Sequence, residues 1–201
     1  MNARFVLIRG GAGVAGCALL GAAMWLYTVE PKVDAEVLDP IRTSGKVGKV
    51  ISNPEFDLKV EGVVVARSLK QGLGSITSRP PVTTDGVFLI VTGRAMAQKE
   101  PMTLDTAVLE TPGGYTFKKA SRTSVSSNLA FSDFQPLIWG RWSHIFEVPK
   151  NRLAGAHMVI SESSLFIAPS AATEVDLGIT KARATQMINT AAVNYDPSGR
   201  S

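Results

Sequence analysis

Apolar and charged residues alternate along several short segments in the middle of this chain, a pattern typical of β-strands with one solvent-facing side. In residues 55–66 (EFDLKVEGVVVA) every second position from Phe56 to Val60 is apolar, and the positions between them are charged. Residues 86–96 (GVFLIVTGRAM) instead contain a continuous apolar run. Such a run predicts a central strand that is covered on both faces.

Turn signals separate further strand-like segments. The sequence TPGG at 111–114 lies between residues 104–110 and 115–120 and predicts a hairpin. Helical periodicity is absent from residues 46–180, and seven or eight short strands in these roughly 135 residues fit an all-β fold. We therefore expect an immunoglobulin-like antiparallel β-sandwich, with a closed barrel as the main alternative. The remaining strands are expected in residues 136–149, 157–168 and 174–179.

The amino-terminal segment has a different pattern. Residues 10–27 carry no charge, and the apolar stretch from Phe5 to Tyr27 is long enough to cross a bilayer as a helix. Arg4 and Arg9 precede this stretch, and acidic residues follow it. The positive-inside rule then predicts a single-pass cell-membrane protein with a cytoplasmic amino terminus and an extracytoplasmic body.

This segment also fits three other patterns less well. The glycines of GGAGVAGC (10–17) fit a dinucleotide-binding pattern, but the following residues are apolar all round and no second strand–helix crossover follows. Cys17 fits a lipoprotein cleavage site, although the apolar run continues beyond it. A cleaved signal peptide lacks a small-x-small site at the expected distance. An uncleaved anchor is favoured.

Within the predicted span, Gly13, Cys17 and Gly21 recur every four residues. Small residues at this spacing allow another transmembrane helix to approach closely, so these three positions are candidates for membrane helix packing. The alternative is that glycine and alanine are simply frequent in membrane anchors.

The chain is thus expected to have four parts. Residues 1–27 hold a short cytoplasmic end and the membrane anchor, and residues 28–45 form an extended linker with Pro31 and Pro40. Residues 46–180 form the sandwich, and residues 181–201 form a flexible tail with few large apolar side chains.

Charge and cysteine content exclude some functions. Five of the 21 basic residues and one of the 17 acidic residues lie outside residues 28–180, which leaves 16 of each sign in that region. A neutral body does not favour nucleic-acid binding. The single cysteine rules out an intramolecular disulfide and a cysteine zinc cluster.

The body offers little catalytic chemistry. His144 shares strand parity with Trp142 and Phe146, which predicts a packed ring, and His157 opens the next strand. Ser143 and His144 are strand neighbours and would point to opposite faces, so they cannot form a nucleophile–base pair. We expect no enzyme activity, no catalytic residue, no cofactor and no metal site.

Candidate partner contacts come from two segments. Trp142 is expected in the core, and Trp139 is then expected to face outward beside Arg141, a composition found in binding hot spots. The alternative is a tryptophan at the rim that packs on a loop. The serine-rich loop at 121–135 carries Phe131 and Phe134, which we also consider candidate contacts.

Two short motifs support a family resemblance. They are Leu104, Asp105, Gly114 and Tyr115 in the first motif, and Gly140, Phe146, Glu147, Val148 and Pro149 in the second. With the strand GVFLIVTGRAM, they resemble the telokin-like immunoglobulin-fold domain of actinobacterial secreted and membrane-anchored proteins, over residues 45–180. The resemblance implies a fold and an extracytoplasmic location, and it supplies no catalytic residue.

These expectations lead to a functional hypothesis. The chain is expected to be a membrane-anchored extracytoplasmic interaction module, an accessory subunit of a cell-envelope membrane complex. Its expected partners are the lipid bilayer and other membrane or envelope proteins, with no nucleic acid. A ligand-binding or adhesive cell-surface protein is the alternative.

Overall fold

The computed structural model describes residues 19–22, 24–25, 41–70, 80–104, 106–120, 133–161 and 171–197. It divides the chain into two compact units, Met1–Leu38 and Asp39–Ser201. In the first unit, the described residues 19–22 and 24–25 are helical and exposed. No helix among the described residues is long and apolar enough to cross a membrane. Most of the expected anchor and residues 28–40 of the expected linker lie outside the described residues.

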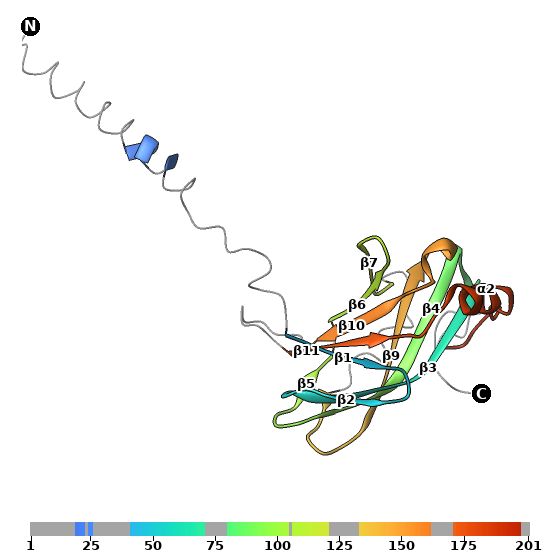
Figure 1. The fold of residues 1–201 in the computed structure, drawn as a ribbon, viewed down its shortest axis with the longest axis horizontal. Helices are drawn as coiled ribbons and strands as arrows, with labels where there is room; N and C mark the ends of the chain where they lie inside the picture. Colours follow the sequence, from blue (N-terminus) through green and yellow to red (C-terminus); the bar gives the residue numbers. More distant parts are fainter. Residues whose placement is uncertain are drawn as a thin grey trace, which may run out of the picture. The chain divides into compact units, whose positions relative to one another are not determined.

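The second unit is a β-sandwich (Figure 1). Its strands are β1 Ile41–Lys46, β2 Val50–Ser52, β3 Phe56–Leu69, β4 Val82–Ala97, β5 Met102–Thr103, β6 Thr106–Thr111, β7 Tyr115–Lys118, β8 Asp133–Phe134, β9 Gly140–Val148, β10 His157–Ser161 and β11 Ala171–Asp176. One sheet has the order β1-β11-β10-β6-β7, the other has the order β2-β3-β4-β9, and β5 pairs with β8. The predicted β-sandwich is confirmed.

The sequence pattern explains the central strands. β4 lies between β3 and β9, and its residues 87–91 are all buried, as the continuous apolar run predicted. The expected hairpin is β6–β7, in which Gly113 and Gly114 have φ angles of 91° and 75°. Glycine adopts this left-handed region without a steric penalty, which is why the chain can reverse there.

The edge strand β1 differs from the prediction in two respects. The sequence predicts a linker for residues 41–45, but they belong to a strand that starts at Ile41. This strand pairs with β11 in parallel, with Ile41 opposite Ala171, so the sandwich is not entirely antiparallel. IRTSGK has no apolar alternation because both faces of this edge strand are largely exposed.

The main core fills the space between the two sheets and includes Phe56, Leu89, Trp142, Phe146 and Met158. A second, smaller cluster of Ala66, Leu69, Phe88, Ile90, Ala120 and Ile145 has the partly buried Val82, Ala192 and Tyr195 packed against it. The alternation along β9 separates the clusters, because Ile145 belongs to the second and its neighbour Phe146 to the first.

The expected flexible tail is wrong for residues 181–197. Lys181–Asn189 form helix α2, whose first turn is capped by the Thr180 hydroxyl accepting a hydrogen bond from the Arg183 amide at 3.2 Å. After the helix, the Ala192 amide donates to the Val65 carbonyl at 3.0 Å and the Arg67 amide donates to the Ala192 carbonyl at 2.8 Å. The tail thus adds backbone pairing to the second half of β3.

Candidate functional site

The strongest candidate is a tight turn at the start of β9. The Ile138 amide donates a hydrogen bond to the Gln135 carbonyl at 3.4 Å, which closes a four-residue turn. Pro136 occupies the second position and Leu137 the third, where φ is 64°. Proline followed by a residue with positive φ is the geometry of a type II turn. In Figure 1 the segment leading into β9 lies at the end of the sandwich that also carries β2 and β5.

Three consecutive apolar side chains of this turn face solvent. Leu137 is 82% exposed, Ile138 is 63% exposed and Trp139 is 39% exposed. A cluster of this kind is unusual on a protein surface, where hydrophobic residues are normally exposed singly. We call Leu137, Ile138 and Trp139 the apolar turn. Leu137 and Ile138 gain little from burial within the fold, and Trp139 is partly covered by it.

Leu137 occupies a position that favours glycine. Leu137 and Asn194 are the non-glycine residues with positive φ among those described. Such a conformation is strained by roughly 1–3 kcal/mol in a residue with a β-carbon. Burial in the core does not explain the choice of leucine, because its side chain is almost fully exposed. The leucine therefore occupies a strained position without a compensating contact in the core.

Replacing Leu137 by glycine is expected to stabilise the fold and to remove one of the three exposed apolar side chains of the turn. Removal of the β-carbon relieves the strain, and the greater freedom of glycine in the unfolded chain offsets part of the gain, so the free energy of unfolding should rise by about 1 kcal/mol. Urea unfolding followed by circular dichroism measures the change. The matched control, Ile138→Gly, lacks a positive φ and should lose about 0.5 kcal/mol.

Of the four candidate contact residues, two are exposed, one is buried and one lies outside the described residues. Trp139 and Arg141 are both exposed, as expected, and Trp142 is buried in the main core. Phe134 is not available for a partner, because it lies in β8 with 2% exposure and fills the space beside Gly140. Phe131 lies outside the described residues. Sequence reasoning missed Leu137 and Ile138.

The structure also describes His144 and one of the three residues predicted to pack membrane helices. His144 is fully buried, and its ring lies 5.3 Å from that of Trp142 and 6.5 Å from that of Phe146, so the expected packed ring is confirmed. Of the predicted helix-packing residues, Gly13 and Cys17 lie outside the described residues. Gly21 is helical and exposed, and helix packing through it stays a prediction.

A row of basic residues crosses the outer face of the four-stranded sheet near the turn. Lys59 of β3 lies opposite Arg94 of β4, and Arg94 lies opposite Arg141 of β9. Glu61 forms an ion pair with Arg94 at 3.2 Å, and no second acid among the described residues pairs with this row. Like charges directly opposite one another destabilise a sheet. We call Lys59, Arg94 and Arg141 the basic row.

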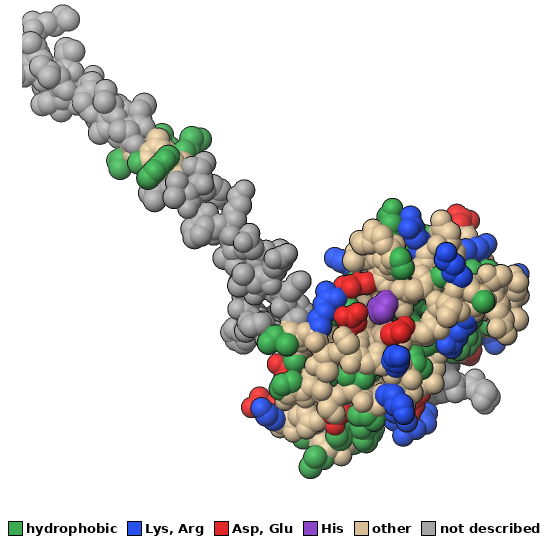
Figure 2. Space-filling model, viewed as in Figure 1, with side chains coloured by type: hydrophobic (Ala, Val, Ile, Leu, Met, Phe, Trp, Pro, Cys, Tyr) green, Lys and Arg blue, Asp and Glu red, His purple; other side chains and the backbone are tan. Residues whose placement is uncertain are grey.

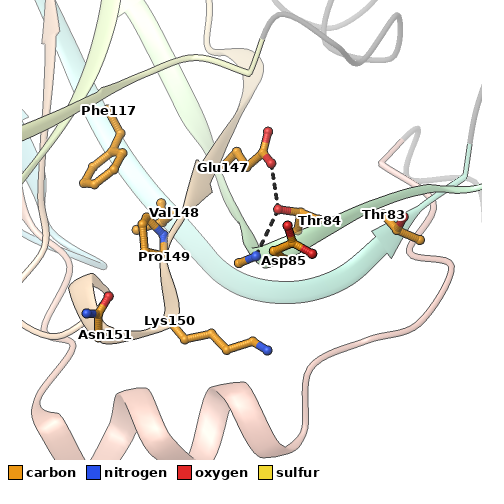
Figure 3. Close-up of a pocket in the computed structure, with 10 residues that line it drawn as sticks. Thr83, Thr84, Asp85, Phe117, Glu147, Val148, Pro149, Lys150 and Asn151 are labelled. Atoms are coloured by element: carbon orange, nitrogen blue, oxygen red, sulfur yellow. Dashed lines mark hydrogen bonds between the residues drawn. The ribbon is translucent and has the colours of Figure 1, made fainter.

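A polar hollow lies at the opposite end of β9 (Figure 3). Its volume is about 890 Å³, and it is bordered by residues 83–86, 147–151 and Phe117. The Thr84 hydroxyl donates a hydrogen bond to Glu147 Oε1 at 2.6 Å and accepts one from the Gly86 amide at 3.1 Å. In Figure 3 Phe117 lies on the other side of Val148 and Pro149 from these polar groups.

The outer face of the five-stranded sheet carries a second polar group. His157 lies opposite Glu110 and Asp176 in the sheet register, and its Nδ1 is 3.5 Å from Glu174 Oε1. Figure 2 shows the histidine among acidic side chains where Figure 1 draws β10 and β11. Arg42 Nη1 reaches Glu110 Oε2 at 2.9 Å. Within the described ranges, no three His, Cys, Asp or Glu side chains converge as they would around a metal ion.

Comparison with known proteins supports the fold. No protein-family model matches the chain, and no curated protein matches its sequence. The crystal structure of the yjhA protein from Bacillus subtilis is similar with a TM-score of 0.51 at 10% identity, covering 66% of this chain and 98% of that one. An uncharacterised β-sandwich protein from Clostridium difficile has a TM-score of 0.41 at 13% identity, covering 73% of this chain and 99% of that one. At this identity the first likeness indicates a shared fold alone.

Proposed function

We propose that the chain is a membrane-anchored extracytoplasmic β-sandwich that acts as a non-catalytic interaction module, an accessory subunit of a cell-envelope membrane complex. The observation that carries this proposal is the apolar turn. It presents Leu137, Ile138 and Trp139 to solvent, and it keeps a strained leucine where glycine would fit better. Surfaces that retain strain and exposed apolar side chains are typical of binding sites.

The order of the strands supports the immunoglobulin type within the sandwich class. If β3, β4, β6, β7, β9, β10 and β11 are taken as strands A, B, C, C′, E, F and G, the two sheets have the orders A-B-E and G-F-C-C′. Immunoglobulin domains have this division of strands. The same order is consistent with the resemblance to telokin-like domains of secreted and membrane-anchored proteins.

The amino-terminal sequence supports the membrane location. Residues 10–27 are uncharged, Arg4 and Arg9 precede them, and Glu30 and Asp34 follow. This distribution favours a span with the carboxyl-terminal domain outside the cytoplasm.

The positions of the candidate chemical groups support a non-catalytic role. His144 is enclosed in the core between two aromatic rings. Ser143 and His144 are strand neighbours and face opposite sides of β9, where a nucleophile and its base would have to meet.

Co-purification tests the proposal. The full chain, extracted from native membranes with a mild detergent, is expected to remain associated with other membrane proteins at a fixed ratio. Recovery of a lone monomer after mild extraction would contradict the accessory-subunit role. Labelling of intact cells provides the topology control, because the sandwich should react with an impermeant reagent and the amino terminus should not.

The polar hollow favours a second candidate function, ligand binding at the cell surface. Thr84, Asp85, Glu147 and Asn151 offer hydroxyl, carboxylate and amide groups to a polar ligand such as a wall polysaccharide. A ligand-binding protein would retain purified wall polysaccharide in the absence of any other protein. The interaction module is expected to retain none under these conditions.

A further inference from the structure

The chain enters the sandwich at the same end as the apolar turn. β9 begins beside this turn, and Gly140 pairs with Ala95 near the end of β4. The β2–β3 turn lies at the same end, because Phe56 pairs with Ala97, and Glu55 Oε2 in this turn accepts a hydrogen bond from the Ala171 amide of β11 at 3.2 Å. Ile41 lies opposite Ala171 in the parallel pair β1–β11. The first residue of β1 therefore lies at the end of the domain that carries the turn.

This position limits how far the turn can be from a tethering membrane. Residues 28–40 connect the expected span to Ile41, and thirteen residues reach at most about 45 Å even when fully extended. The polar hollow lies beyond the other end of β9, a nine-residue strand about 30 Å long. Ile41, the first described residue of the sandwich, lies at the end with exposed leucine, isoleucine and tryptophan.

The basic row adds charge to this apolar end. Arg141 is two residues from Trp139, and its cross-strand neighbours Arg94 and Lys59 extend the positive charge over β4 and β3. Glu61 offsets the charge of Arg94 through its ion pair, and Asp133 is exposed four residues before Leu137, so the positive charge left for an anionic surface is mainly that of Lys59 and Arg141. A bilayer with anionic lipids offers negative charge in its headgroups, an interfacial zone that tryptophan favours, and an acyl region for leucine and isoleucine.

We propose that the apolar turn and the basic row together form a membrane-contact tip, which rests on anionic lipid headgroups of the bilayer that holds the amino-terminal span. This inference rests on the proposed function for the membrane tether, and it differs from that function in assigning the apolar turn to lipid and not to a protein partner.

Site-specific labelling of the full chain tests the tip. Cys17 is the single cysteine, so a Cys17→Ser background accepts one new cysteine at Ile138 for an environment-sensitive fluorophore. The matched control is Asn151→Cys, which is exposed at the other end of β9. Both proteins are reconstituted into vesicles of phosphatidylcholine alone, or with about one third phosphatidylglycerol.

The label at position 138 is expected to shift to the blue and to resist an aqueous quencher in the anionic vesicles. Both effects should weaken in about 1 M salt, where screening shortens the range of electrostatic attraction to a few ångströms. The label at position 151 should show the emission of an aqueous environment, and should remain open to the quencher, in both kinds of vesicle and at both salt concentrations. Arg141→Glu should reduce the contacting fraction by roughly tenfold, whereas Lys150→Glu, the same charge change at the other end, should leave it unchanged.

The outcomes distinguish failure of the lipid contact from failure of the membrane tether. If the chain floats with the vesicles but the label at position 138 stays in water, the tip is wrong and the tether stands. If the chain does not float with the vesicles, the tether is wrong, and the tip with it. Protection that requires added envelope proteins, or that rises with the protein-to-lipid ratio, would overturn lipid contact in favour of a protein partner or a second copy of the chain.

Discussion

Gly93→Ala is expected to be among the most damaging single-methyl changes in the sandwich. A β-carbon at this position of β4 would lie 2.2 Å from the Lys59 carbonyl oxygen and 2.7 Å from Cζ2 of Trp142. The carbonyl belongs to the paired strand β3 and cannot move without disturbing the ladder. Overpacking of this kind costs about 3 kcal/mol, which we expect as the loss in the free energy of unfolding.

Urea unfolding of the full chain in a mild detergent measures this loss. Arg94→Ala is the matched control, because Arg94 is the next residue of β4 and is exposed on the outer face, and a change there should stay within about 0.5 kcal/mol. In a double-mutant cycle, Gly93→Ala and Trp142→Phe should be less than additive, because phenylalanine removes the ring contact and leaves the closer carbonyl contact. A Gly93→Ala protein as stable as the parent would show that β3 and β4 separate easily.

The strands of the sandwich could be predicted where their environment imposes a local pattern. β3 has one face in the core, so its apolar and polar residues alternate, and β4 is covered on both faces, so its apolar residues are continuous. β1 could not be found in this way. It lies at an edge with little burial, and its partner β11 is at the other end of the domain sequence.

The helix α2 was missed because its sequence resembles that of a polar tail. Among its nine residues only Ala184 is buried, and its larger apolar residues are the last-turn pair Met187 and Ile188. The helix is held by its Thr180 cap and by the pairing of the following residues with β3, contacts that a local sequence pattern does not contain.

The sequence predicted two exposed residues at the candidate site, Trp139 and Arg141, and missed Leu137 and Ile138. Strand parity with Trp142 correctly placed Trp139 and Arg141 outside. Leu137 falls within the strand predicted for residues 136–149, and leucine itself gives no sign of a turn with a positive φ. The proline at position 136 was the available signal, since proline favours the second position of such turns. Phe134 was misplaced because loop composition does not show that a two-residue strand buries it.

Asn53→Ala is expected to cause a loss of similar size by opening the tie between the two sheets. Asn53 is buried, and its Oδ1 accepts hydrogen bonds from the amides of Glu55 and Phe56 at 2.9 and 2.8 Å. Its Nδ2 donates to the Thr173 hydroxyl of β11 at 3.1 Å. Alanine would leave these partners unsatisfied, at about 3 kcal/mol in the free energy of unfolding.

Thr173→Val separates the two parts of this effect. Valine has the shape of threonine and removes only the bond between the sheets, so the expected loss is about 1 kcal/mol, well below that of Asn53→Ala. The two changes should be less than additive in a double-mutant cycle, because they share the Asn53–Thr173 bond. Strict additivity would show that this bond contributes nothing. In that case the hydrogen bonds within the β2–β3 turn alone would account for the effect of Asn53, and the start of β11 would be held to the turn by Glu55.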